Sequence, residues 1–347
     1  MTARMRAAAV LFAFVLAACA PRFDAPAPSA PFAAPRLESD AILAADGARL
    51  PLRAWLPEGE AEAVILALHG MNDYSNAFAE PALFWRARGI AVYAYDQRGF
   101  GATATRGIWP GHAALAADFA AATTLLRARH PGKRVFVLGE SMGGAVALSS
   151  LTGETPAPVD GAILVAPAVW GRATMGLAPR LALWAAVRAV PSMTITGRGL
   201  DVKPSDNIEM LKALGRDPLV IKGTRIDAVW GLVNLMDEAL EAAPRVKTPL
   251  LVLYGAKDEL IPRAPTRRFL ARLSPEADAR VAYYPAGYHM LTRDLQANVV
   301  LADVAAWVKG RANGHTPALP SGADAGGRAA LAEAEAPARE MRERNAP

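Results

Sequence analysis

A serine at the junction of an apolar strand and an apolar helix constrains the fold of this chain more than any other feature. Residues 134–138 predict a buried strand and residues 144–151 predict a helix. Between them stands the sequence Gly139-Glu140-Ser141-Met142-Gly143. A strand that turns sharply into a helix exposes the side chain at the tip of the turn and points the helix N–H groups toward it. We therefore expect Ser141 to lie at the carboxyl end of a parallel strand.

The residues around Ser141 suit such a turn. Gly139 and Gly143 carry no Cβ, so neighbouring backbone can pass close to them. The N–H of Met142 would face the oxyanion that forms when the serine attacks a carbonyl carbon. A strand, the pattern Gly-x-Ser-x-Gly and a helix together predict a nucleophile elbow with Ser141 as the nucleophile.

A serine hydroxyl needs a general base to act as a nucleophile, so a histidine must lie nearby. The chain has five histidines. In this kind of site the acid and then the histidine follow the serine along the chain. His289 satisfies that order and lies in a loop between a predicted strand, residues 281–284, and a last helix that begins at residue 294. We expect His69, which precedes Ser141, only to brace its own loop.

The acid should lie between Ser141 and His289, at the carboxyl end of a strand, where it can orient the imidazole. Asp258 follows the apolar run 249–254 and fits this position, whereas the other aspartates of the interval lie in a helical stretch or before a strand. A second oxyanion donor should come from the loop after the strand 63–68, and we predict the N–H of Met71.

Apolar runs alternate with amphipathic helical stretches along the chain. Continuous apolar runs are typical of strands that are covered on both faces, so the pattern predicts an α/β fold with a mostly parallel sheet and helices on both sides. The predicted strands are residues 63–68, 90–95, 134–138, 162–165 and 249–254, with a helix at 113–129. Residues 42–55 instead alternate in polarity around Asp46-Gly47, which predicts an antiparallel hairpin at the sheet edge.

One segment, about residues 169–243, interrupts the alternation. It contains amphipathic pieces without a clear strand and is too long for a simple loop, so it predicts a helical insertion. Its Trp170, Trp184 and Trp230 suit an acyl chain, although amphipathic helices need apolar residues for ordinary packing as well.

The N-terminus has the pattern of a signal peptide, predicted over residues 1–18. Arg4 and Arg6 precede the apolar residues 7–18, a stretch too short to span a bilayer as a helix. The stretch ends in Leu16-Ala17-Ala18-Cys19, which resembles the bacterial lipobox and implies a lipid anchor on Cys19. The sequence therefore predicts a protein exported and anchored to the bacterial cell envelope, with the outer membrane favoured in a Gram-negative source. A plain secretory signal with an incidental cysteine is the alternative.

Composition sets the remaining expectations. Residues 19–36 are rich in Ala and Pro and predict a tether, and residues 311–347 predict a disordered tail, which leaves 37–310 as the folded domain. The net charge of +5 is dispersed and does not favour nucleic acid as a partner. A single cysteine and five histidines without metal-ligand spacing predict neither an internal disulfide nor a metal site, and we expect no cofactor.

Five motifs in order resemble those of the α/β-hydrolase superfamily, especially its monoacylglycerol lipase and lysophospholipase branch, which is grouped with the serine aminopeptidase S33 type of domain. The motifs are His69-Gly70-Met71, Asp96-Gln97-Arg98-Gly99-Phe100-Gly101, Gly139-Glu140-Ser141-Met142-Gly143-Gly144, Gly255-Ala256-Lys257-Asp258 and Gly287-Tyr288-His289. The resemblance implies an eight-stranded, mostly parallel sheet with a helical lid after the sixth strand. It also implies a catalytic triad of Ser141, Asp258 and His289, with Met71 and Met142 as oxyanion donors.

The resemblance implies a serine hydrolase that cleaves carboxylic esters through an acyl-enzyme, on a small-molecule substrate related to monoacylglycerol or lysophospholipid. The same triad would serve an aminopeptidase, an amidase or an acyltransferase, and those alternatives stay open. Proline-specific aminopeptidases of similar fold usually carry Trp after the nucleophile, so Met142 weakens that option. A non-catalytic surface lipoprotein fits least well, because a binding module would not need all three triad residues. The oligomeric state stays undetermined.

Overall fold

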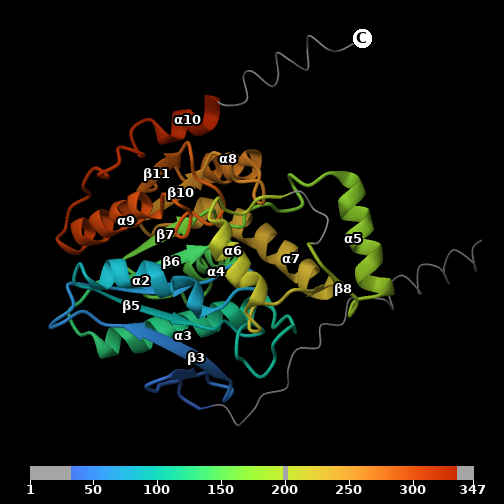
Figure 1. Ribbon diagram of the computed structural model, residues 1–347, viewed down its shortest axis with the longest axis horizontal. Coiled ribbons are helices and arrows are strands. Elements are labelled where there is room, and N and C mark those ends of the chain that lie inside the picture. The colour runs from blue at the N-terminus through green and yellow to red at the C-terminus, as the bar shows by residue number, and fades with distance from the viewer. Residues whose placement is uncertain (1–32, 198–201, 334–347) are drawn as a thin grey trace, which may run out of the picture.

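A nine-stranded sheet forms the centre of the computed structural model, which describes residues 33–197 and 202–333 (Figure 1). Neighbouring strands from β5 to β11 run parallel, and β1, β2 and β3 add an antiparallel edge, as the alternating residues 42–55 predicted. In spatial order the strands are β1 (Arg36–Leu37), β2 (Ala41–Leu43), β3 (Arg49–Trp55), β5 (Ile90–Tyr95), β4 (Ala63–Leu68), β6 (Val135–Glu140), β7 (Gly161–Val165), β10 (Leu250–Gly255) and β11 (Ala279–Tyr284). The expected eight strands become nine because the two-residue β1 pairs with β2 at the outer edge.

The central strands are covered on both faces, which explains their continuous apolar sequences. All six residues of β4 are buried. Its Val64, Leu66 and Leu68 belong to the core on one face of the sheet, and Ala63, Ile65 and Ala67 to the core on the other. Because side chains alternate along a strand, only a strand buried on both faces needs apolar residues at every position.

Helices cover both faces of the sheet. Residues of α3, α4, α7 and α8 pack into the core on one face, and residues of α2 and α9 pack into the core on the other. The bounds are α2 (Ala79–Arg86), α3 (His112–Arg129), α4 (Met142–Leu151), α7 (Ile226–Ala242), α8 (Arg263–Arg272) and α9 (Ala297–Ala312), with short 3₁₀ turns at Ser75–Phe78 and Ala243–Arg245. The helix that follows Ser141 is therefore held between the sheet and an outer layer that includes α7.

The segment between β7 and β10 is mainly helical and contains a short ribbon that the sequence did not predict. It includes α5 (Leu177–Ala189), α6 (Ile208–Arg216) and α7, and β8 (Thr194–Ile195) pairs antiparallel with β9 (Thr224–Arg225). Buried residues of α7 such as Leu235 belong to the core of the main domain. By contrast, α5 stands at the edge of the molecule with α7 between it and the sheet (Figure 1).

The prediction of a disordered tail from residue 311 is wrong as far as residue 333. Helix α9 continues to Ala312, an ordered stretch with a buried Leu319 follows, and α10 (Gly327–Glu333) buries Leu331. The segment covers the edge strand β11, where Tyr283 donates its N–H to the carbonyl of Ala323 at 2.9 Å. An uncovered strand edge offers free backbone groups, so a segment with few apolar residues can still be held there. Composition alone does not reveal such a binding edge.

Several predictions concern residues outside the described ranges. The signal peptide of residues 1–18, Cys19, most of the tether and residues 334–347 all lie there. Within the described ranges, no helix is both long and apolar enough to cross a membrane. The same residues contain no group of three or more His, Cys, Asp or Glu side chains arranged to hold a metal ion.

Candidate active site

Ser141 lies at the tip of the turn between β6 and α4, in a conformation that is strained for a serine. Its φ is 52° and its ψ is −114°. Residues other than glycine rarely adopt positive φ, and such strain persists only where surrounding contacts enforce it. Here the Ser141 N–H donates to the carbonyl of Val165 at 2.9 Å, and the Ser141 carbonyl accepts the N–H of Ala168 at 2.9 Å. The turn that the sequence predicted is thus fixed to the end of β7.

Gly139 and Gly143 are required by the close approach of neighbouring backbone. A Cβ at Gly143 would lie 2.1 Å from the carbonyl oxygen of Leu68, and a Cβ at Gly139 would lie 2.5 Å from that of Gly143. Neither atom is the end of a flexible side chain, so no small adjustment would make room. The two glycines let the turn close against the end of β4.

The loop after β4 lies directly beside Ser141, as its predicted role in providing an oxyanion donor requires. A Cβ built on Gly70 would be 3.4 Å from Cβ of Ser141. Met71 follows Gly70 in this loop, and Met142 is the first residue of α4, where the N–H has no partner within the helix. The two predicted oxyanion donors therefore flank Ser141 from different segments.

His69 braces this loop, which is the role that the sequence predicted for it. Its Nε2 accepts the N–H of Gln97 at 3.0 Å, so Nδ1 carries the proton and donates to the carbonyl of Gly70 at 2.8 Å. The side chain is fully buried, and burial lowers its pKa. His69 is therefore held as a neutral imidazole and is not exposed for proton transfer.

Asp258 and His289, the predicted acid and base, are joined by a hydrogen bond. Nδ1–H of His289 donates to Oδ2 of Asp258 at 2.9 Å, and both residues are buried. The other carboxylate oxygen, Oδ1, accepts the N–H groups of Leu260 and Ile261, each at 2.9 Å. With both oxygens occupied, the carboxylate is fixed and holds the imidazole in the tautomer whose Nε2 is free to accept a proton.

A cluster of charged residues beside the nucleophile was missed by the sequence analysis. Arg293 donates from Nη1 to Oδ2 of Asp73 at 2.8 Å and from Nη2 to Oε1 of Glu140 at 2.6 Å. Thr292 donates from Oγ1 to Oε2 of Glu140 at 3.0 Å. Burial lowers the pKa of Arg293, but Glu140 and Asp73 more than offset this effect, so its pKa is raised and it stays charged. A usable signal was Glu140 itself, a carboxylate between an apolar strand and the serine that requires a buried cation as a partner.

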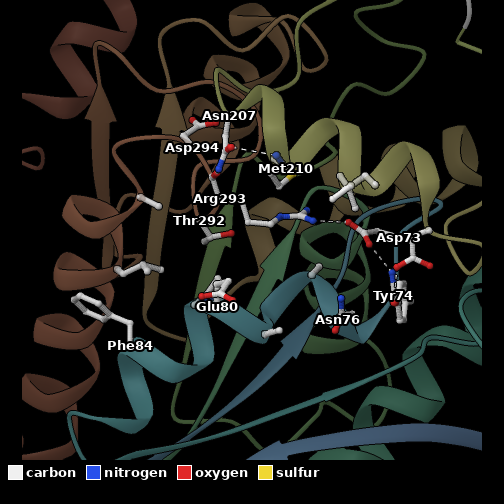
Figure 2. A pocket seen from close by; sticks show the side chains of 18 of the residues that line it. Asp73, Tyr74, Asn76, Glu80, Phe84, Asn207, Met210, Thr292, Arg293 and Asp294 are labelled. Carbon is white, nitrogen blue, oxygen red and sulfur yellow. Dashed lines mark hydrogen bonds and ion pairs between the residues drawn. The ribbon is translucent and has the colours of Figure 1, made fainter.

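A cavity of about 440 Å³ adjoins this cluster on the side of α2 and α6 (Figure 2). Its wall is mainly apolar, with Phe84, Met210 and Leu214 among the residues that line it. Arg293 and Asp73 are also part of the wall, whereas the residues of the predicted triad are not. The ion pair therefore lies between the cavity and the segment that carries Ser141.

The loop that carries His289 is also tied to the lid. Ser205 donates from Oγ to Oδ1 of Asp294 at 2.6 Å, and Asn207 donates from Nδ2 to the carbonyl of Arg293 at 3.0 Å. The N–H of Met290, next to the base, donates to the carbonyl of Pro204 at 3.1 Å. Burial raises the pKa of Asp294 to about 6. Residues 204–207 of the lid are thus fixed to the loop that positions the base.

The chain is similar to several known proteins. The family model described as "Serine aminopeptidase, S33" matches residues 59–296. A monoacylglycerol lipase of Mycolicibacterium smegmatis is 28% identical over 266 residues, which cover 76% of this chain and 93% of the relative. The monoglyceride lipase of Homo sapiens is 27% identical over 280 residues, covering 78% of this chain and 90% of the relative. The crystal structure of a soluble variant of Saccharomyces cerevisiae monoglyceride lipase, in complex with a substrate analogue, superposes with a TM-score of 0.64 at 18% identity, covering 84% of this chain and 99% of that one.

Proposed function

The chain belongs to the serine aminopeptidase S33 family, and on that premise we propose that it hydrolyses carboxylic esters related to monoacylglycerol or lysophospholipid through an acyl-enzyme. The observation that carries the proposal is the hydrogen bond between Asp258 and His289, found in a chain that also holds Ser141 at a strained strand-to-helix turn. Relatives from a bacterium and from Homo sapiens that bear the name of monoacylglycerol or monoglyceride lipase support the ester class.

The arrangement supports a two-step mechanism. Ser141 attacks the ester carbonyl while Nε2 of His289 takes its proton, and Asp258 stabilises the imidazolium. The N–H groups of Met71 and Met142 stabilise the oxyanion. His289 then gives the proton to the leaving alcohol, and water, activated by the same imidazole, releases the acid from Ser141. Apart from solvent water and the ester itself, each step needs only groups that this chain supplies.

The apolar lid supports lipid-like substrates and contact with a lipid surface. Among the described residues, eight of the twelve large hydrophobic side chains that are exposed lie between residues 177 and 208, including Leu177, Leu181 and Trp184. Large exposed apolar patches mark sites of interaction with protein or lipid. The tryptophans also serve ordinary packing, since Arg188 stacks on Trp184 and Arg172 stacks on Trp230. The exposed leucines of α5 thus support the lipid proposal better than the tryptophans do.

Asp206 and Glu209 of the lid give little support to an aminopeptidase, which would need a carboxylate for the free amino group of its substrate. Asp206 accepts the N–H of Leu295 at 2.9 Å, and Glu209 pairs with Lys212 on the surface. Asp201 lies outside the described residues. Ester hydrolysis is therefore the better supported of the two activities.

A substrate panel tests the proposed class. We expect turnover of p-nitrophenyl esters, 1-monoacylglycerols and lysophosphatidylcholine, with kcat/KM rising by up to about fourfold for each added methylene until the acyl site is full, because each buried CH₂ contributes about 0.8 kcal/mol. An aminoacyl p-nitroanilide should be a poor substrate. Initial rates at matched substrate concentrations below micelle formation measure the series.

The control for the panel is the Ser141→Ala protein, which should leave every rate at background. A higher kcat/KM for the anilide than for any ester would overturn the ester proposal in favour of an aminopeptidase. Transfer of the acyl group to an added alcohol in preference to water would point to an acyltransferase.

We propose further that the mature protein is exported and anchored to the cell envelope by lipid on Cys19, in the outer membrane if the source is Gram-negative. The apolar residues 7–18 and the lipobox-like end of that stretch support this proposal. Expression in a bacterial host with radiolabelled palmitate should label the wild type and leave Cys19→Ser unlabelled. Equal labelling of the two proteins, or of neither, would contradict the anchor.

A further inference from the structure

Three separate segments of the active site meet at one buried side chain, Arg293. The loop after β4, which carries the Met71 oxyanion donor, provides Asp73. The end of β6, one residue before the nucleophile, provides Glu140. Arg293 itself belongs to the loop between β11 and α9, four residues after His289. Oxyanion donor, nucleophile and base are thus connected through a single guanidinium group.

We propose that Arg293 is a positioning residue that holds the nucleophile, the oxyanion loop and the base loop in their reactive arrangement. The inference rests on the acyl-enzyme mechanism proposed above and assigns a role within it. Arg293 does not touch the reacting atoms and acts through Asp73 and Glu140.

The geometry of the contacts supports this role. A guanidinium group is planar and donates in a fixed fork, so one side chain can fix two carboxylates relative to each other. Each oxygen of both carboxylates has a donor, because Glu140 also accepts the hydroxyl of Thr292 and Asp73 also accepts the N–H of Tyr74 at 2.9 Å. Figure 2 shows the Arg293 side chain reaching across the wall of the cavity toward Asp73. The cluster is therefore a rigid connection and not a loose surface ion pair.

Because the cluster is buried, Arg293 also balances the negative charges of Asp73 and Glu140. Asp73, Glu140 and Arg293 are all less than 10% exposed. Without Arg293, two buried carboxylates would be left without their cation beside the site where the oxyanion forms. They would repel each other and the oxyanion, and the loops that carry them would move apart. Loss of Arg293 should therefore affect the transition state more than the binding of substrate.

Arg98 provides a matched control, because it is a second buried arginine that bridges two aspartates. Its Nη1 lies 2.6 Å from Oδ2 of Asp46, and its Nη2 lies 2.8 Å from Oδ1 of Asp118. Asp46 is in the turn of the edge hairpin and Asp118 is in α3, so this bridge connects no two parts of the active site. Loss of Arg98 should cost stability in the same way without disturbing the triad.

The experiment compares Arg293→Lys and the charge-balanced triple variant Asp73→Asn/Glu140→Gln/Arg293→Met with Arg98→Met. Activities are normalised to the amount of folded protein, measured by circular dichroism. We expect kcat of both Arg293 variants to fall about 100-fold, which is the cost of displacing a reacting group by about 1 Å. KM should change by no more than about threefold. Arg98→Met should lower Tm but leave kcat within about threefold of wild type.

A second readout, the rate at which a fluorophosphonate labels Ser141, does not depend on the choice of substrate. Slower labelling of both Arg293 proteins at an unchanged fold supports the positioning role. If the triple variant folds and reacts as fast as wild type, Arg293 only balances charge and the proposal is overturned. A kcat loss in Arg98→Met as large as that in Arg293→Lys would also overturn it, since any buried arginine would then suffice. Failure of the wild type to label would instead refute the acyl-enzyme mechanism.

Discussion

Replacing Ser141 by alanine should lower kcat by about 10⁵- to 10⁶-fold, because without the hydroxyl no acyl-enzyme can form and only the oxyanion donors and substrate binding remain. The fold should survive, since the hydrogen bonds that fix the turn are made by the Ser141 backbone. Alanine carries the same Cβ as serine and adopts the φ of 52° at a similar cost. Ester hydrolysis and fluorophosphonate labelling measure the loss, and thermal unfolding measures the fold.

Ser150→Ala is the matched control for that substitution. Ser150 is a buried serine of α4, the helix that follows Ser141, and its Oγ donates to the carbonyl of Ala116 at 3.3 Å. The variant should keep its activity and its labelling by the probe. Equal labelling of Ser141→Ala and wild type would show that another residue is the nucleophile.

The second large effect is expected from Asp258→Asn, at about 10⁴-fold in kcat. Oδ1 of Asp258 accepts two backbone N–H groups, so the amide oxygen of the substituted side chain would take that place and its NH₂ group would face His289. Nδ1 of His289 would then have to accept that hydrogen bond. The proton would move to Nε2, and the imidazole could no longer act as the base toward Ser141. Stopped-flow ester hydrolysis with a chromogenic substrate measures the change.

Asp303→Asn controls for the loss of a buried carboxylate. Asp303 is fully buried in α9, where its Oδ2 accepts the hydroxyl of Tyr284 at 2.8 Å. This variant should unfold at a lower temperature and yet keep kcat within about threefold of wild type. If Asp258→Asn behaved in the same way, with wild-type kcat and only a lower Tm, then Asp258 would be a structural residue and not the acid of the triad.

Much of the active site could be predicted from the sequence because its main features are local or ordered along the chain. The turn at Ser141 needs glycines at fixed positions, and backbone atoms at 2.1 and 2.5 Å from the missing Cβ atoms show why. The apolar residues of β4 mark a strand covered on both faces. Asp258 and His289 follow in order at the ends of strands, and they meet because parallel strands end at one edge of the sheet.

The tail illustrates the opposite case. Its composition resembles that of disordered segments, yet Leu331 is buried, and a Cβ on Gly327 would lie 2.1 Å from the carbonyl oxygen of Val281. The order comes from the edge of β11 and not from the tail's own sequence. Composition indicates how much apolar surface a segment can bury by itself, but it does not show whether another part of the chain provides a surface to which the segment can bind.

The sequence alone determined the α/β class and was enough to predict the nucleophile, its acid and its base, because turns, strand polarity and chain order are properties of short stretches. Only the tertiary structure decided how these parts are held together. Arg293 reaches Glu140 across 153 residues of sequence and Asp73 across 220, and no local pattern pairs them. Buried charges must find partners wherever the fold brings them, so their pairing follows from the packing of the whole domain around Ser141.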